Sequence, residues 1–195
     1  MRVVVVVAHP DPASFNHAIA ATAHAALIEG GHEVTVLDLY AGGFRAAMSY
    51  DERRAYHSDR PLLDPLAERH AGIVKQAEAL VFVYPTWWST VPAILKGWLE
   101  RVMVPGVGFV FDENQHVRRG LTHVHHLIGI STYGARWPSV KIIHDNGRRT
   151  LLRALRLNTA VVTRRSWLAL YAIDTRTVEQ RAAFLRRVQR KMHAL

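Results

Sequence analysis

The stretch VVVVVAHPDPASFN, residues 3–16, decides the fold. Residues 3–7 form an unbroken run of valines, and such a β-branched run is typical of a strand that is buried on both faces. Strands of this kind belong to parallel sheets that helices cover on both sides. A polar loop follows the run, and Ser14 can cap a helix that Gly30 and Gly31 then end. The stretch therefore predicts a central strand, a loop and a helix, in that order.

Strands and helices continue to alternate along the rest of the chain. Further strands are predicted at residues 33–39, at 79–84 with Pro85 ending the strand, at 124–130, and starting at 160–162. Helices are predicted at residues 65–77, in the segment VPAILKGWLERV at 91–102, within 151–157 and at 177–192. Ser89 or Thr90 can cap the second of these helices, and Thr177 with Gln180 matches a capping box for the last. Residues 40–65 carry turn residues without clear periodicity, which indicates a long surface segment.

This alternation predicts an α/β fold with a mainly parallel sheet, right-handed crossovers and helices on both faces. Five strands in 195 residues suit a flavodoxin-like three-layer sandwich with a five-stranded parallel sheet in the order 2-1-3-4-5. The length favours a single domain over residues 1–195. In sheets of this kind, ligands bind beyond the carboxyl ends of the strands. We therefore expect the chemistry in the loops after the first, third and fourth strands.

The composition excludes several kinds of chemistry. The chain has no cysteine, so it can form no disulfide, thiolate nucleophile or iron–sulfur cluster, and any redox chemistry needs a bound cofactor. His123, His125 and His126 lack a carboxylate at ligand spacing, so we expect no metal site. The net charge of +9 comes largely from scattered arginines, which indicates a solvated basic surface and no nucleic-acid partner. The longest apolar stretch, residues 3–8, is too short for a membrane span, so we expect a cytoplasmic protein.

Polar and aromatic residues fill the three loops at the expected edge. After the first strand, amides at the start of the helix, with His9 and Ser14, can hold a phosphate; the alternative is an ordinary capped turn that His9 braces. After the third strand, Trp87 and Trp88 can flank a flat heterocycle, or else contact the core or a second subunit. After the fourth strand, the segment STYGA at residues 131–135 can bring backbone donors close to a ligand.

Three segments resemble those of a known family. AHPDPASFN at residues 8–16, LDLY at 37–40 and YPTWWSTVPAILKGWLERV at 84–102 are similar to the NAD(P)H:quinone oxidoreductases of the DT-diaphorase type and their shorter bacterial relatives. The similarity covers roughly the first two thirds of the chain in consistent order. Members of that family are homodimers with a flavodoxin-like fold and a flavin at each subunit boundary. The resemblance therefore implies a homodimer that binds FAD, with FMN as the alternative.

The resemblance also implies roles for individual residues. It assigns the phosphate and ribityl part of the flavin to His9, Ser14, Phe15 and Asn16, and the isoalloxazine to Pro85, Thr86, Trp87 and Trp88. It assigns the pyrimidine edge to Ser131, Thr132, Tyr133 and Gly134. Backbone donors of Tyr133 and Gly134, helped by His144, would stabilise charge on the reduced ring as catalytic groups. The family's catalytic tyrosine falls at Pro138 or Ser139 here, so His144 alone remains of the family's tyrosine and histidine.

The activity that follows is a flavin-dependent NAD(P)H:quinone oxidoreductase. A hydride from NAD(P)H would pass through the flavin to a quinone or similar acceptor in a two-electron ping-pong reaction. Two alternatives stay open, namely a regulatory flavoprotein subunit of a potassium-efflux transporter and a one-electron flavodoxin carrier. The basic charge argues against the carrier, because such carriers are usually acidic. These residues determine neither the natural acceptor nor the choice between NADH and NADPH.

Overall fold

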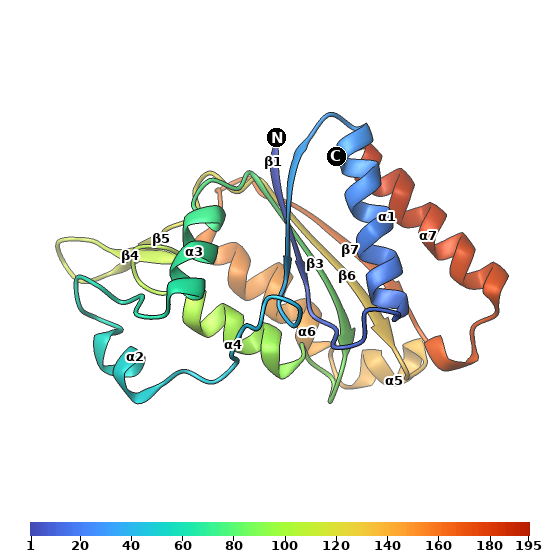
Figure 1. The fold of residues 1–195 in the computed structure, drawn as a ribbon, viewed down its shortest axis with the longest axis horizontal. Coiled ribbons are helices and arrows are strands. Elements are labelled where there is room, and N and C mark those ends of the chain that lie inside the picture. Colours follow the sequence, from blue (N-terminus) through green and yellow to red (C-terminus); the bar gives the residue numbers. More distant parts are fainter.

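The run of valines forms an inner strand of a five-stranded parallel sheet in the computed structural model, which describes all 195 residues (Figure 1). In spatial order the strands are β2 (Glu33–Asp38), β1 (Arg2–Val7), β3 (Ala79–Thr86), β6 (His126–Tyr133) and β7 (Arg164–Leu170). All four neighbouring pairs are parallel. Counted along the chain, the order is 2-1-3-4-5, so the predicted fold class and strand order are confirmed.

Helices cover both faces of this sheet, which gives three layers (Figure 1). One face carries α1 (Phe15–Glu29) and α7 (Val178–His193), and the other carries α3 (Pro65–Val74) and α4 (Ala93–Val102). Val4 and Val6 of β1 pack into the core on the α3 and α4 side, whereas Val3, Val5 and Val7 pack into the core on the α1 and α7 side. Residues 3–7 of the strand are all apolar because both of its faces are buried there.

The helix ends agree with the sequence at three positions and differ at others; the helix predicted at residues 65–77 is α3, which ends at Val74. Ser14 caps α1 by accepting from the amide of His17, Gly30 lies at its carboxyl end, and Thr177 with Gln180 forms a capping box on α7. The predicted cap of α4 by Ser89 or Thr90 is wrong, because α4 begins at Ala93 behind Pro92 and no side chain caps it. None of the helices is both long enough and apolar enough to cross a lipid bilayer.

Three predicted strands have wrong boundaries. The fourth strand, predicted at residues 124–130, is β6, which runs from His126 to Tyr133, so Ser131, Thr132 and Tyr133 belong to the strand and not to the loop after it. The fifth strand does not begin at residues 160–162, where Val161 and Val162 are exposed, but is β7, which begins at Arg164. Its first residues are charged because β7 lies at the edge of the sheet, so its sequence lacks the expected apolar run. Pro85 does not end β3, which continues to Thr86. A proline next to the end of a strand removes only one backbone hydrogen bond between the strands.

Several short elements are absent from the sequence prediction, and the helix predicted within residues 151–157 is a π-helical turn followed by a 3₁₀ turn. The segment predicted as irregular surface contains α2 (Tyr50–Ala55), which Ser49 and Glu52 cap, and a hairpin of β4 (Phe109–Phe111) and β5 (Val117–Arg119) projects beyond α4. After β6 come α5 (Trp137–Ile142), α6 (Asn146–Arg149), a π-helical turn (Thr150–Ala154) and a 3₁₀ turn (Leu155–Asn158). This connection and a 3₁₀ turn at Ile173–Thr175 lie near the carboxyl ends of β6 and β7 (Figure 1).

A buried ion network holds the surface segment against the rest of the fold. Arg101 of α4, only 2% exposed, donates to Glu52 at 2.6 Å and to Asp64 at 2.9 Å, and also to the carbonyl oxygen of Arg45. Burial alone would raise the pKa of Asp64, but the amides of α3 and the Arg101 guanidinium lower it to about 2. Removing either carboxylate would leave the buried guanidinium with an uncompensated charge, which strongly destabilises a fold.

Candidate functional site

The loops after β1, β3 and β6 meet at the carboxyl edge of the sheet because these strands are adjacent and parallel. Two hydrogen bonds tie the loops together across this edge. The hydroxyl groups of Thr86 and Ser131 lie 2.8 Å apart, which joins β3 to β6. The Asn16 amide nitrogen donates to the Thr132 hydroxyl at 3.1 Å, which joins the start of α1 to the end of β6. Residues far apart in sequence therefore form one polar surface.

The first loop presents donors toward this surface. The amide of Asp11 donates to Nδ1 of His9 at 3.1 Å, so a neutral His9 carries its proton on Nε2 and can donate it to a ligand. Ser14 accepts from the His17 amide and bonds Nδ1 of His17 at 3.0 Å, while Nε2 of His17 contacts the Asp38 carboxylate at 2.8 Å. Because a carboxylate can only accept, neutral His17 carries its proton on Nε2, and its Nδ1 accepts a hydrogen bond from the Ser14 hydroxyl. The hydroxyl of Ser14 is thus oriented by His17 and Asp38.

The start of α1 adds backbone donors beside these side chains. The first turn of a helix leaves its amides without intrahelical acceptors. The amides of His17 and Ala18 donate to Ser14, which leaves those of Phe15 and Asn16 as the donors nearest the loop after β6. Such a helix start favours negatively charged groups.

The second loop is a tight turn that displays an indole. The backbone of Trp87 exchanges two hydrogen bonds with that of Thr90, at 3.2 and 3.1 Å. The two central residues, Trp88 and Ser89, both have left-handed backbones, with φ of 46° and 61°. This is the pattern of a type I′ turn, which normally uses Asn and Gly. The turn leaves Trp88 99% exposed, and the ring of Trp87 lies 5.9 Å from that of His9.

A buried tyrosine at the end of β6 anchors the third loop. Tyr133 is buried, and its hydroxyl donates to the Asp145 carboxylate, with both oxygen atoms at 3.0 Å. Burial and the charge of Asp145 raise the pKa of Tyr133 well above its ordinary value, so the phenol stays protonated. The ring of Tyr171 packs against that of Tyr133 at 4.8 Å. These contacts fix the backbone at Tyr133 and the exposed Gly134 next to it.

Comparisons with known proteins agree with this architecture. A family described by its flavodoxin-like fold matches residues 1–193 of the chain. The chain belongs to this family.

Curated proteins that are similar to part of the chain carry the names of oxidoreductases. The ribosyldihydronicotinamide dehydrogenase-like protein traD of Penicillium crustosum is 33% identical over 134 residues, 62% of this chain and 50% of that protein. The NAD(P)H dehydrogenase (quinone) 1 of Rattus norvegicus is 34% identical over 127 residues, 56% of this chain and 46% of that protein. The chain thus spans about half the length of these curated relatives.

Solved structures match the whole chain. Smu.1420 from Streptococcus mutans is 25% identical with a TM-score of 0.86, covering 100% of both chains. The NAD(P)H:quinone oxidoreductase from Methanothermobacter marburgensis is 24% identical with a TM-score of 0.81, covering 99% of this chain and 98% of that chain. The second similarity concerns the fold alone.

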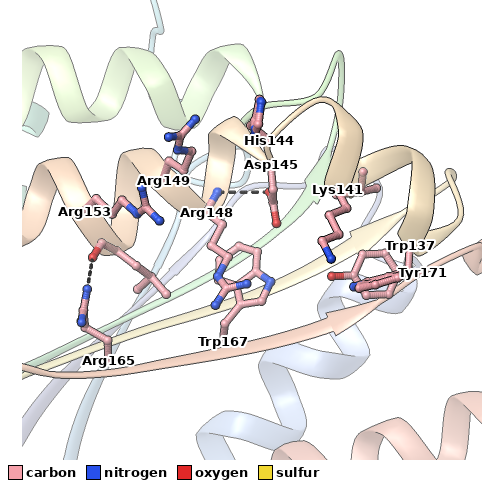
Figure 2. A pocket seen from close by; sticks show the side chains of 12 residues that line it. Trp137, Lys141, His144, Asp145, Arg148, Arg149, Arg153, Arg165, Trp167 and Tyr171 are labelled. Carbon is pink, nitrogen blue, oxygen red and sulfur yellow. Dashed lines mark hydrogen bonds between the residues drawn. The ribbon is translucent and has the colours of Figure 1, made fainter.

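Within this family fold, the sheet edge brings together most of the residues that the sequence singled out. These are His9, Ser14, Asn16, Pro85, Thr86, Trp87, Trp88, Ser131, Thr132 and Gly134. Three others lie differently. Phe15 packs its ring against Phe184 of α7, Tyr133 turns its phenol inward, and His144 lies beyond α5 beside a separate cavity (Figure 2). The Tyr133 side chain is thus turned away from the other loops, so only its backbone is left for the predicted role, and no hydrogen bond joins the His144 side chain to these loops.

Sequence reasoning missed four residues that shape the site. His17, Asp38 and Asp145 orient Ser14 and Tyr133, and Tyr171 packs under the third loop. A histidine three residues after a cap residue can reach the cap in the first turn of a helix, so the spacing of Ser14 and His17 carried a usable signal. Asp145 and Tyr171 carried none. His123 bonds the Val74 carbonyl oxygen at 3.2 Å, and no three His, Asp or Glu side chains lie together in a geometry that could hold a metal ion.

Proposed function

We propose that the protein is a flavin-dependent NAD(P)H:quinone oxidoreductase, in which a hydride from NAD(P)H reaches a quinone in two successive half-reactions. Its family membership, and the named activities of the curated relatives, support this class of enzyme. Those names favour an enzyme over a regulatory transporter subunit. The observation that carries the proposal is the state of Asn16 at the meeting point of the loops.

Asn16 is buried and its side chain is only half satisfied. Its amide nitrogen donates to Thr132, but its Oδ1 is buried and has no hydrogen-bond donor. A buried polar atom without a partner costs about 1–3 kcal/mol, so it marks a place where a ligand hydroxyl can donate. The ribityl chain of a flavin carries such hydroxyl groups. The residues therefore fit a flavin. His9 can donate to its phosphate, Asn16 can accept from a ribityl hydroxyl, and the exposed indole of Trp88 can lie beside its ring system.

Each part of the site has a distinct task in this proposal. The bound flavin would supply the two-electron chemistry, which protein side chains cannot perform. His9 and the free amides of α1 would bind the phosphate, and Asn16 would orient the ribityl chain. Trp87 and Trp88 would flank the ring system and exclude water from it. The amides of Tyr133 and Gly134 would donate toward the ring edge that gains negative charge, a role worth about 3 kcal/mol per donor in other enzymes.

The exposed Trp88 also supports the proposed homodimer. An indole that is 99% exposed leaves a large apolar surface in water, and a second subunit that covers it would remove that cost. We expect the flavin at this subunit boundary. Light scattering after size-exclusion chromatography should give a mass of two chains, and a Trp88→Ala variant should shift toward one chain.

The test begins with the purified protein as it is isolated. Heat release and chromatography of the yellow chromophore should identify FAD or FMN, and the protein should oxidise NADH or NADPH with menadione as acceptor. Initial rates at several concentrations of both substrates should give parallel double-reciprocal lines. Intersecting lines would overturn the two-step scheme. Colourless protein that takes up neither FAD nor FMN would overturn the whole assignment.

Asn16 can be tested directly against a matched control. Asn16→Asp replaces the amide that donates to the Thr132 hydroxyl with a carboxylate that can only accept from it, and adds a negative charge near the proposed phosphate. We therefore expect at least tenfold weaker flavin binding by fluorescence titration of the apoprotein. Asn114→Asp makes the same chemical change on the exposed β4–β5 turn and should leave flavin binding unchanged. Equal flavin affinity in both variants would refute the role of Asn16.

A further inference from the structure

A second site lies apart from the three loops, along the outer strand of the sheet. A cavity of about 490 Å³ lies between β7 and the connection from α5 to the π-helical turn (Figure 2). It extends from Tyr171, just past the end of β7, to Arg165 near its start, which is about 20 Å of extended chain. A second cavity of about 670 Å³ shares Arg149, Arg153 and Arg165 with the first and continues it. We call the two together the β7 groove.

The β7 groove carries an excess of positive charge that no protein group neutralises. Five cationic side chains line the first cavity: Lys141, Arg148, Arg149, Arg153 and Arg165. None of them forms an ion pair within the chain. The one carboxylate in the lining, Asp145, accepts from Tyr133 and from the backbone amide of Arg148. Like charges gathered in a cavity repel one another, and a multiply charged anion would relieve this repulsion.

Aromatic side chains line the same groove. The ring of Trp167 packs against Gly129 of β6, where a Cβ atom would come within 2.1 Å of it. The Arg148 guanidinium lies 5.9 Å from the centre of this ring, and the Lys141 ammonium lies 4.9 Å from that of Trp137. The indole N–H of Trp167 is buried and donates no hydrogen bond, so it is an unmet donor at the wall of the cavity.

Three of the arginines and two of the aromatic residues lie at opposite ends of the groove, whereas Arg148 and Lys141 lie beside aromatic rings. Figure 2 shows Arg149, Arg153 and Arg165 at one end, and Trp137 and Tyr171 at the other. A ligand that fits both ends has a flat ring at one end and a doubly charged group at the other. A cavity of this volume is the size that small ligands occupy, and a polymer would have to enter it one unit at a time.

We propose that the β7 groove binds a nucleoside phosphate, with the base against the aromatic residues and the phosphate between the arginines. This chemistry has two sources, the phosphorylated adenosine half of NADPH and a free nucleotide that binds as a separate ligand. The proposal does not rest on the flavin assignment, because the five cationic residues that would bind the phosphate lie outside the three loops, although Asp145 and Tyr171 of the groove also contact Tyr133.

Calorimetry on the purified protein tests the binding. The probes are adenosine 2′,5′-bisphosphate, adenosine and inorganic phosphate, each at low and at high salt. We expect the bisphosphate to bind at least tenfold more tightly than either fragment and to weaken as salt rises. The double variant R149Q/R153Q loses two arginines whose side chains make no hydrogen bond in the protein, and it should weaken bisphosphate binding at least tenfold. Arg186→Gln on the exposed face of α7 is the control and should change the affinity less than twofold.

Steady-state kinetics separates the two sources. If the ligand is NADPH, R149Q/R153Q should raise the KM for NADPH at least tenfold and leave that for NADH unchanged. If the ligand is a separate nucleotide, the variant should lose bisphosphate binding with neither KM changed. The proposal is overturned if no probe binds, or if the double variant binds the bisphosphate as tightly as the parent does. It is also overturned if a single-stranded oligonucleotide binds more tightly than the mononucleotide and Arg186→Gln weakens that binding as much as R149Q/R153Q does. A protein that holds no flavin could still pass the calorimetric test, so the two proposals fail separately.

Discussion

Replacing Gly129 by alanine should push Trp167 out of its place in the β7 groove. A Cβ atom at residue 129 would lie 2.1 Å from Cζ3 and 2.4 Å from Cε3 of Trp167, whereas carbon atoms pack at about 3.5–4.0 Å. The ring must therefore move by about 1.5 Å. Hydrogen bonds between β6 and β7 keep the strands in register, and Tyr84 lies against the ring at 6.3 Å. We expect Gly129→Ala to lower the free energy of unfolding by about 2 kcal/mol, as overpacking of a core does.

Urea denaturation followed by circular dichroism measures this loss, and two further variants isolate its cause. Gly72→Ala makes the same change in α3, where a Cβ atom meets nothing within 4 Å, and should stabilise the protein by about 0.5–1 kcal/mol because alanine favours helix. In a Trp167→Leu background the new methyl group has room, so most of the penalty of Gly129→Ala should disappear. The reasoning is refuted if Gly129→Ala costs the same in both backgrounds, or costs nothing.

Three further predictions concern the loops and helix ends. The pKa of Asp64 in the folded protein is about 2, below its ordinary 3.8, so ionised Asp64 stabilises the fold fully above about pH 5 and less as the pH falls. Asp64→Asn should therefore lower the free energy of unfolding by about 2 kcal/mol at pH 7 and by about 1 kcal/mol at pH 3, as urea denaturation can measure. Ser89→Gly should raise the free energy of unfolding by about 1 kcal/mol, because glycine adopts φ of 61° without strain; no gain would contradict the type I′ turn. Thr177→Ala should lower the unfolding free energy by about 1 kcal/mol through loss of the α7 cap, and calorimetric melting should show a lower Tm.

The parts of the fold that local pattern determines could be predicted from the sequence. The valine run of β1 and the helical spacing of α4 each depend on burial that repeats along one element, so composition reveals them. Parallel pairing then brings the ends of β1, β3 and β6 to one edge, which is why three loops chosen from sequence lie together. The resemblance supplied the chemistry of the expected ligand, which spacing alone did not.

The missed parts depend on contacts between distant segments. β7 begins with charged residues because one of its edges meets solvent, so its strand pattern is hidden. Asp145 contacts Tyr133 only because the chain turns back after α5. The β7 groove needs β6, β7 and the helical connection together. One signal for it was present, since glycine within a buried strand often marks the close approach of another group, and Gly129 makes room for Trp167.

Backbone strain connects these missed contacts to the proposed function. The residues with positive φ other than glycine are Trp88, Ser89, Gln115, His144, Asp145 and Ala172, and all except Gln115 lie in the loops at or beside the carboxyl edge of the sheet. Each such residue costs about 1–3 kcal/mol and persists only where the surrounding structure holds it. Here the holding contacts are visible, because Asp145 binds Tyr133 and the amide of Ala172 donates to Ala135. Glycine or asparagine usually occupies positions with positive φ, because these residues adopt it at little cost. These contacts hold the edge in one conformation, which would lower the entropy cost of binding the proposed flavin and would orient the backbone donors of the third loop in advance.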